Sequence, residues 1–378
     1  MNVYLDNAAT TPLDPEVFEA MRPFMLEDFG NPSSTHAHGR KVRAAIESSR
    51  KKIADLLSCT PGEIIFTSGG TEADNAILAG AVRNYQIRHV ISSKIEHHAV
   101  EHTLALMAGH GSIELHYVRL DEKGNPDLSD LERLLKIYPA ALVSLMHANN
   151  EIGNLLDLQR TGEICASYNA YFHSDTVQTM GHYRHDMRKL EVSAMTAAAH
   201  KFHGPKGVGF MYLKKDRKIS PMVSGGSQER NMRGGTENTY GIVGLAKALE
   251  IAYRDMEDHE RHIKGLKKQM ITALTEKIPG ISFNGESGDV EKSLYTVLSV
   301  SLPESEENEL LLFNMDISGI SASGGSACSS GAASGSHVIN ELYPGSKRTP
   351  LRFSFSKFNT AEEINFAADK LAALLVES

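Results

Sequence analysis

A lysine set among small residues is the first side chain in this sequence that could do chemistry. Lys201 ends an alanine-rich stretch and is followed by a turn of glycine and proline and then by an apolar run over residues 208–213. Small neighbours leave room for an aldehyde cofactor, and an amine removed from water loses its proton more easily. Lys201 is therefore a candidate Schiff-base lysine, although a lysine considered alone is more often exposed. Lys206, between a proline and a glycine on the same turn, fits a backbone or surface role better.

Two glycine-rich loops could bind anions. Residues 67–72 read Thr-Ser-Gly-Gly-Thr-Glu and lie between an apolar run and a helical pattern. The free N–H groups of a helix start, a close backbone approach at Gly70 and the hydroxyl of Thr71 would together make a phosphate cradle. The loop lacks the spacing of a nucleotide-binding P-loop, and similar capped turns occur in many folds without a ligand. The loop at residues 225–236 is dense in donors and suits an anion site or a subunit contact.

Polar residues follow three further apolar runs. Asp175 could hold a pyridine nitrogen protonated, which would make a pyridoxal ring an electron sink, and Gln178 could reach an oxygen of the same ring. Asn150 could bind a substrate carboxylate, and His97 could stack on a flat cofactor or move a proton. Each residue also has an ordinary alternative, as a turn residue, a helix cap or a surface imidazole.

No metal site is expected from the sequence. Zinc binding at His97 and His98 is not expected, because we identify no second ligand motif of the HxxxH or CxxC type beside them. The chain has three cysteines, Cys59, Cys165 and Cys328, whose wide spacing fits neither a disulfide framework nor a metal site. An odd number of free thiols suits a reducing cytoplasm.

The third cysteine lies in an unusual segment. Residues 320–335 consist mainly of serine, glycine and alanine, with Cys328 near the middle. Such a segment cannot bury much surface of its own, so we expect it to move. A thiol on a mobile segment could enter a buried site and then meet a partner protein. The alternative is a linker with an incidental cysteine, but a free cysteine is usually buried.

The elements that must position these residues alternate along the chain. The strand candidates are residues 64–67, 89–93, 113–118, 141–146, 171–174, 194–198 and 208–213. Helical patterns fill most of the intervals, which predicts an α/β fold with a largely parallel sheet covered by helices on both faces. Ligands of such sheets bind at the carboxyl ends of the strands, where the polar motifs cluster.

Length and pattern predict two domains. The chain has 378 residues, and a typical domain has ~150, so the chain is too long for one small domain. We expect a large domain over residues 14–255 and a smaller α+β domain formed by residues 1–13 and 256–378. A charged helical region over residues 241–277 is expected to run from one domain into the other.

Composition excludes several functional classes. Hydrophobic residues make up 41% and charged residues 23% of the chain, as in an ordinary globular protein. The net charge of -8 gives no basic field for nucleic acid. No apolar run approaches the ~20 residues of a membrane span, and a strand pattern begins at Val3, which leaves no room for a signal peptide. We therefore expect a cytoplasmic protein with neither nucleic acid nor membrane as a direct partner.

Taken together, the motifs resemble those of the pyridoxal-phosphate cysteine desulfurases of the iron–sulfur assembly type, within the class V aminotransferase group. The resemblance covers nearly the whole chain, in the order YLDNAATT, GNPSSTH, TSGGTEADN, EHHAV, HANNEIG, HSDTVQ, AHKFHGPKG, ERNMRGGTEN, SGGSACSSG and LRFSFSKF. Each motif is weak alone, but the ordered set is very specific. It implies fold type I, with a seven-stranded, mostly parallel sheet in the large domain.

The resemblance also implies roles for individual residues. Lys201 matches the lysine that forms the Schiff base with pyridoxal 5'-phosphate, and Cys328 matches the nucleophile that becomes a persulfide. The other matches to cofactor-binding residues are Gly70, Thr71, Asp175, Gln178, His200 and His97, whose imidazole would stack on the ring and serve in catalysis. Thr236 is expected to reach the phosphate of the other subunit in a homodimer. Asn150 and Arg352 match the residues that bind the substrate carboxylate.

The implied reaction removes sulfur from L-cysteine, giving L-alanine and a persulfide that passes to an iron–sulfur scaffold or another acceptor protein. A selenocysteine lyase or another class V aminotransferase-like enzyme would share the cofactor residues, and a non-enzymatic scaffold or nucleotide-binding module is the alternative from another class. One departure concerns the phosphate, because this chain has Ala198 where the family usually has a serine three residues before the lysine. Thr196 or a water molecule is the candidate replacement.

Overall fold

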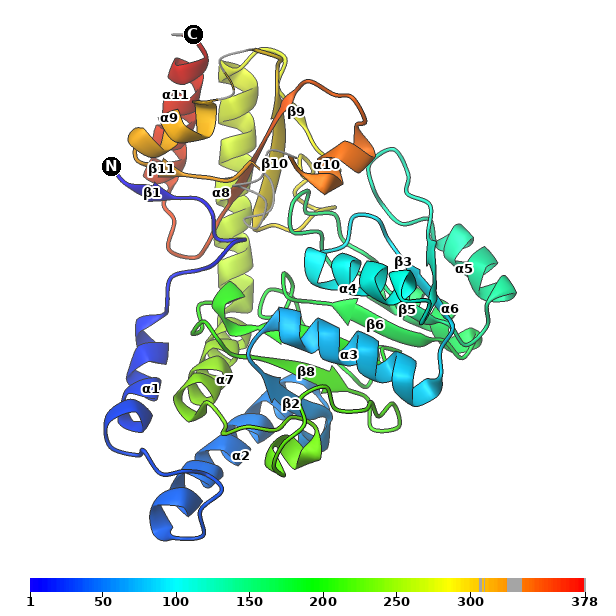
Figure 1. Ribbon diagram of the computed structural model, residues 1–378. Helices are drawn as coiled ribbons and strands as arrows, with labels where there is room; N and C mark the ends of the chain where they lie inside the picture. The colour runs from blue at the N-terminus through cyan, green and yellow to red at the C-terminus, as the bar shows by residue number, and fades with distance from the viewer. Residues whose placement is uncertain (306–307, 309, 325–334, 377–378) are drawn as a thin grey trace.

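The core of the molecule is a seven-stranded sheet, drawn in Figure 1 in a computed structural model that describes residues 1–305, 308, 310–324 and 335–376. The strand order is β2-β8-β7-β6-β5-β3-β4. The strands are β2 (Ile64–Thr67), β3 (His89–Ser92), β4 (Glu114–Tyr117), β5 (Leu142–Ser144), β6 (Tyr171–Asp175), β7 (Ala194–Ala198) and β8 (Gly209–Leu213). Only the β8 pairs are antiparallel. The predicted α/β class and mostly parallel sheet are confirmed.

Helices cover both faces of this sheet because its strands carry apolar residues on both sides. Successive strand residues alternate between two apolar clusters, so that Ile65 and Val90 lie in one and Phe66 and Ile91 in the other. On the first face lie α3 (Gly70–Tyr85) and α4 (His98–Gly109). On the second lie α1 (Pro15–Leu26), α2 (Ala37–Leu57), α5 (Leu128–Ile137), α6 (Leu158–Ser167) and α7 (Thr239–Arg254).

A smaller sheet packs beside the main one. Its order is β12-β10-β9, with β9 (Ser282–Phe283), β10 (Val297–Leu302) and β12 (Thr349–Ser354) antiparallel. The helices α8 (Met256–Lys277), α9 (Leu311–Ile317) and α11 (Ala361–Val376) share its apolar cluster. The short helix α10 (His337–Leu342) packs instead against Ile95 and Ile152. The N-terminal strand β1 (Val3–Tyr4) pairs with β11 (Ile320–Ser321), so both chain ends lie at this part of the molecule (Figure 1). The short 3-10 helices are η1 (Pro61–Glu63), η2 (Ala199–Lys201) and η3 (Gln228–Asn231).

Local sequence signals explain where helices begin and where one helical region is divided. The Asp14 carboxylate accepts from the Glu16 N–H at 2.8 Å before Pro15 opens α1. The predicted helical region over residues 241–277 consists of two helices, because Asp255 leaves helical geometry between α7 and α8. In the described part of the chain, no helix is both long and apolar enough to cross a bilayer.

The division into two domains at residues 14–255 remains a proposal. Two separate clusters of buried side chains support it, one around the main sheet and one that joins α8, α11 and the smaller sheet. The first five residues contribute Val3 and Leu5 to the second cluster, as the proposed boundary requires.

Candidate active site

A cavity of about 220 Å³ lies at the carboxyl ends of the parallel strands. The predicted residues that line it are Gly70, Thr71, His97, Asn150, Asp175, Gln178, His200, Lys201 and Arg352. They come from loops and element ends far apart in the sequence, from the first turn of α3 to strand β12. The fold therefore brings nine of the predicted residues together around one cavity.

Lys201 reaches the cavity because β7 ends in the tight 3-10 turn η2. The last two residues of β7, Ala197 and Ala198, are alanines, and Ala198 lines the cavity, where its small side chain leaves space beside the amine. Its Nζ donates hydrogen bonds to the carbonyl oxygens of Ala8 and Ala9, the latter at 2.9 Å. The amine is thus held by backbone oxygens at the cavity wall.

Asp175 and Gln178 approach the cavity from the end of β6. One carboxylate oxygen of Asp175 accepts from the Val177 N–H at 2.8 Å and from the Thr196 hydroxyl at 3.3 Å, which fixes its orientation. Gln178 donates to the carbonyl oxygen of Ala8 at 3.1 Å. Both side chains are buried, and both line the cavity, where a carboxylate can pair with a bound cation.

Two imidazoles face the cavity in the neutral form. His97 is the N-cap of α4, where its Nδ1 accepts from the Ala99 N–H at 3.1 Å. Burial lowers the pKa of His97, opposed by the charge of Asp175. Burial, followed by the charges of Lys201 and Lys206, lowers the pKa of His200 to about 4. Neither ring adds positive charge to the cavity at neutral pH.

The first turn of α3 forms a cradle of backbone. The helix begins at Gly70, so its first N–H groups have no partner within the helix. A Cβ at Gly70 would lie 2.6 Å from a methyl group of Val177, which lines the cavity, so the turn requires glycine there. A second hollow adjoins the cavity at Gly70, Thr71 and His200. Free N–H groups at a helix start favour an anion in this position.

Arg352 brings a buried cation from the smaller sheet. Its Nη2 donates to the Asp6 carboxylate at 2.8 Å, and its Nη1 donates to the backbone carbonyl of Asn150 at 2.8 Å. Its Nε has no hydrogen-bond partner among the described residues, although Arg352 is only 2% exposed. A buried donor without a partner requires an explanation, and a bound ligand or water molecule in the cavity would provide one.

Comparison with known proteins identifies the family. The sequence profile of the family "Aminotransferase class-V" matches residues 3–366. The chain belongs to this family. Class V aminotransferases bind pyridoxal phosphate, and this chain is therefore a pyridoxal-phosphate enzyme.

Curated relatives and solved structures agree with that assignment. A cysteine desulfurase IscS of Dictyoglomus turgidum is 41% identical over 99% of this chain and 94% of the relative. A cysteine desulfurase IscS of Methanosarcina thermophila is 42% identical over 96% of this chain and 89% of the relative. A solved structure described as a NifS-like protein superposes with a TM-score of 0.92, at 35% identity and over 100% of both chains.

The cavity fits the cofactor of class V aminotransferases. It offers an amine for the aldehyde, a carboxylate for the ring nitrogen, an imidazole beside the ring space and a helix start for the phosphate. The glycine that a side chain could not replace lies where the phosphate is expected. No residue in the lining contradicts this donor set.

The sequence did not identify Asp74 as a member of the site. It lies one helical turn after Gly70 on α3, and that spacing was the available signal, because residues four apart share a helix face. Burial raises the pKa of Asp74 well above its usual value, and the charge of Asp175 raises it further. Burial therefore favours the neutral form of the Asp74 carboxyl group.

One predicted residue that the structure describes, Thr236, is not among those that line the cavity. Thr236 lies in a separate pocket with Thr67 and Arg233, and its expected contact with a second subunit stays a prediction. Cys328 lies outside the described residues. The suggested replacement for the missing serine near the phosphate is not supported, because the Thr196 hydroxyl donates to Asp175 instead.

The expectation that no second metal ligand accompanies His98 was wrong. His102 follows it by four residues on α4, and the ligand atoms of His98, Glu101 and His102 lie within 4.8 Å of one another. The spacing is itself an HxxxH pattern that the sequence prediction overlooked.

Proposed function

We propose that this chain is a cysteine desulfurase that uses Lys201 and Cys328 to take sulfur from L-cysteine, leaving L-alanine and a persulfide on the enzyme. The observation that carries the proposal is one cavity lined by the amine of Lys201, the carboxylate of Asp175 and the guanidinium of Arg352. The cysteine desulfurases at about 40% identity over nearly the whole chain support the same activity.

Pyridoxal phosphate, when bound, supplies an aldehyde that binds amines and a protonated ring that accepts electrons. Lys201 would hold the aldehyde, and Asp175 would keep a proton on the ring nitrogen. Gly70, Thr71 and His200 would hold the phosphate at the start of α3, while His97 would lie against the ring and Gln178 near its oxygen. Once the substrate amine takes its place, the Lys201 amine can remove the proton from the substrate Cα.

Arg352, on the smaller sheet, would orient the substrate together with Asn150. Arg352 and Asn150 would bind the carboxylate of L-cysteine, with the guanidinium plane already fixed by Asp6. The protein thereby selects an amino acid by its two charged groups.

Sulfur transfer requires a thiolate of the protein. The Cys328 thiolate attacks the substrate sulfur, so that an S–S bond forms while the Cβ–S bond breaks and its electron pair stays with the carbon fragment. Protonation of that fragment gives the methyl group of alanine. The two cysteines in the described residues do not suit this role, because burial raises the pKa of Cys59 to about 12 and raises that of Cys165.

Partners of the enzyme belong to the same proposal. A homodimer would bring Thr236 of one subunit to the phosphate of the other, and the persulfide would pass to an iron–sulfur scaffold or another acceptor protein. We propose that this takes place in the cytoplasm, where a reducing environment keeps the three thiols free.

The test replaces the nucleophile and a matched cysteine. Cys328→Ser should lower alanine and sulfide formation from L-cysteine by about 10³-fold or more, while the visible absorbance of bound cofactor stays unchanged. Cys59→Ser should keep wild-type activity, since that thiol is not a thiolate at neutral pH. Full desulfuration by Cys328→Ser would disprove the assigned nucleophile.

A further inference from the structure

A second set of imidazole and carboxylate groups lies at the opposite end of the main sheet, where the strands begin. His89 is the first residue of β3 and pairs in parallel register with Glu114, the first residue of β4. His116 lies two residues along β4, so it points to the same face as Glu114. The catalytic cavity lies beyond the other ends of these strands.

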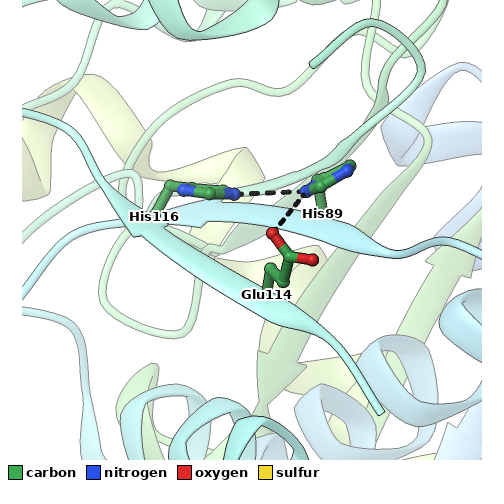
Figure 2. Close-up of side chains that lie close together, drawn as sticks. All are labelled: His89, Glu114 and His116. Atoms are coloured by element: carbon green, nitrogen blue, oxygen red, sulfur yellow. Dashed lines mark hydrogen bonds and ion pairs between the residues drawn. The ribbon is translucent and has the colours of Figure 1, made fainter. Parts of the chain in front are cut away.

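The three side chains converge on a common point (Figure 2). His89 Nδ1 lies 3.3 Å from His116 Nε2 and 3.6 Å from a carboxylate oxygen of Glu114, and all three ligand atoms lie within 4.8 Å of one another. Ligands about 2.0–2.1 Å from a tetrahedral metal ion lie about 3.4 Å apart. Two of the three separations therefore already match the edges of a metal-centred tetrahedron.

An aromatic side chain holds both imidazoles in place. Tyr138 stacks on His116 with ring centroids 4.1 Å apart and on His89 with centroids 4.5 Å apart. The tyrosine in turn packs against the apolar core behind α5. Its contact reduces the freedom of the two rings before any ligand arrives, which lowers the entropic cost of binding.

We propose that His89, Glu114 and His116 form a zinc-binding site that joins strands β3 and β4. Two imidazole nitrogens and one carboxylate oxygen suit Zn²⁺, and a water molecule would complete the tetrahedron.

The position of the site indicates a structural role. β4 is an edge strand, and in the described structure it pairs only with β3. An ion bound by both strands would fasten this edge strand to the sheet. Because the ligands lie at the amino ends of the strands, we expect zinc to change stability and leave the cavity residues in place.

The cluster on α4 is the competing site within the described residues. His102 Nε2 lies 3.2 Å from Glu101, but His98 Nδ1 lies 3.9 Å from it. The rings of His98 and His102 stack with an interplanar angle of 23°, so they meet by their faces. Metal binding uses the ring edges, which is how His89 and His116 meet.

The proposal is tested by zinc affinity of the holoenzyme and its variants, measured by competition with a chromophoric zinc indicator in the absence of L-cysteine. Glu114→Gln keeps size and removes the charge, and His89→Gln removes a nitrogen ligand. Each should weaken the binding of one zinc ion by about 10-fold or more, whereas the matched control His102→Gln should not. His89→Gln should also retain cysteine desulfurase activity.

Two further measurements distinguish zinc bound at this site from zinc bound by cysteine thiolates. X-ray absorption at the zinc edge should show nitrogen and oxygen ligands near 2.0–2.1 Å and no sulfur near 2.3 Å. Zinc at about 100 times its dissociation constant should raise the melting temperature of wild type by about 3 °C and leave that of His89→Gln unchanged. Sulfur ligands, loss of binding only in His102→Gln, or no binding by wild type would each overturn the proposal.

Discussion

Two lysines of this molecule place their amines among oxygen acceptors in the protein interior. Lys201 donates to the carbonyl oxygens of Ala8 and Ala9 at the wall of the cavity. Lys267, on α8, is 0% exposed and donates to the Ser293 hydroxyl at 2.6 Å and to the Leu294 carbonyl oxygen at 3.1 Å.

The difference between the two lysines lies in what surrounds the amine. Lys267 packs within the small-domain side of the molecule, and burial lowers its pKa to about 7. Lys201 lies beside an open volume that also presents a carboxylate, imidazoles and a guanidinium. Burial alone therefore makes an amine less basic, but it becomes a catalytic group only where a ligand can reach it.

Removing the amine of Lys201 should produce the largest loss of activity. Lys201→Ala deletes the group that binds the cofactor aldehyde and removes the substrate proton, so we expect a decrease of about 10³-fold or more in kcat for alanine formation. Borohydride reduction followed by peptide mapping should no longer label position 201. A variant that kept wild-type turnover would remove the distinction between the two lysines.

Asp175→Asn tests whether turnover requires a carboxylate at this position of the cavity. The asparagine keeps the shape and can still meet the Val177 N–H, but it cannot stabilise a protonated ring. We expect a decrease of about 10²-fold in kcat, measured at saturating L-cysteine. Asp186→Asn, on an exposed ion pair with Arg188, is the matched control and should leave kcat unchanged.

The sequence predicted Lys201 because its neighbours carry the signal. Small residues before it and a turn after it distinguish it from a surface lysine, and the seven apolar runs gave the sheet that positions it. The antiparallel direction of β8 could not be predicted from its apolar pattern, because a strand buried on both faces reads the same in either direction.

Lys267 was not predicted, although a weak signal existed. The buried residues Ile263, Met270 and Leu274 share one face of α8 with it, at helical spacing. A lysine at a core-facing position of a highly charged helix reads as a surface residue, because its burial depends on how α11 and the small sheet pack against it. The local pattern therefore predicted the lysine that lines the cavity and missed the fully buried one.

A third buried cation, Arg352, tests whether geometry matters as well as charge. Arg352→Lys keeps the positive charge but loses the two-pronged contact that suits a carboxylate. We expect the KM for L-cysteine to rise about 10-fold while kcat changes much less. Arg348→Lys, whose guanidinium contacts the carbonyl oxygens of Gly280 and Ser301 outside the cavity, should leave KM unchanged. Equal increases in KM in both variants would argue against a substrate contact at Arg352.

Lys267→Met should have the smallest effect on activity, within about twofold, because the amine lies away from the cavity. It should instead raise stability by about 1–3 kcal/mol near pH 6, since methionine fills a similar volume without a buried charge. Thermal unfolding of the holoenzyme at several pH values measures this difference.

The pH dependence separates the charge of Lys267 from its packing. The native amine has a pKa of about 7, whereas the unfolded chain keeps its proton up to about pH 10. Between these values the unfolded state of wild type binds the extra proton, so wild-type stability rises with pH relative to the variant. The advantage of methionine should therefore be largest below pH 7 and should shrink as the pH rises toward 10. An advantage that stayed constant over this range would show that packing, and not the buried charge, distinguishes Lys267 from Lys201.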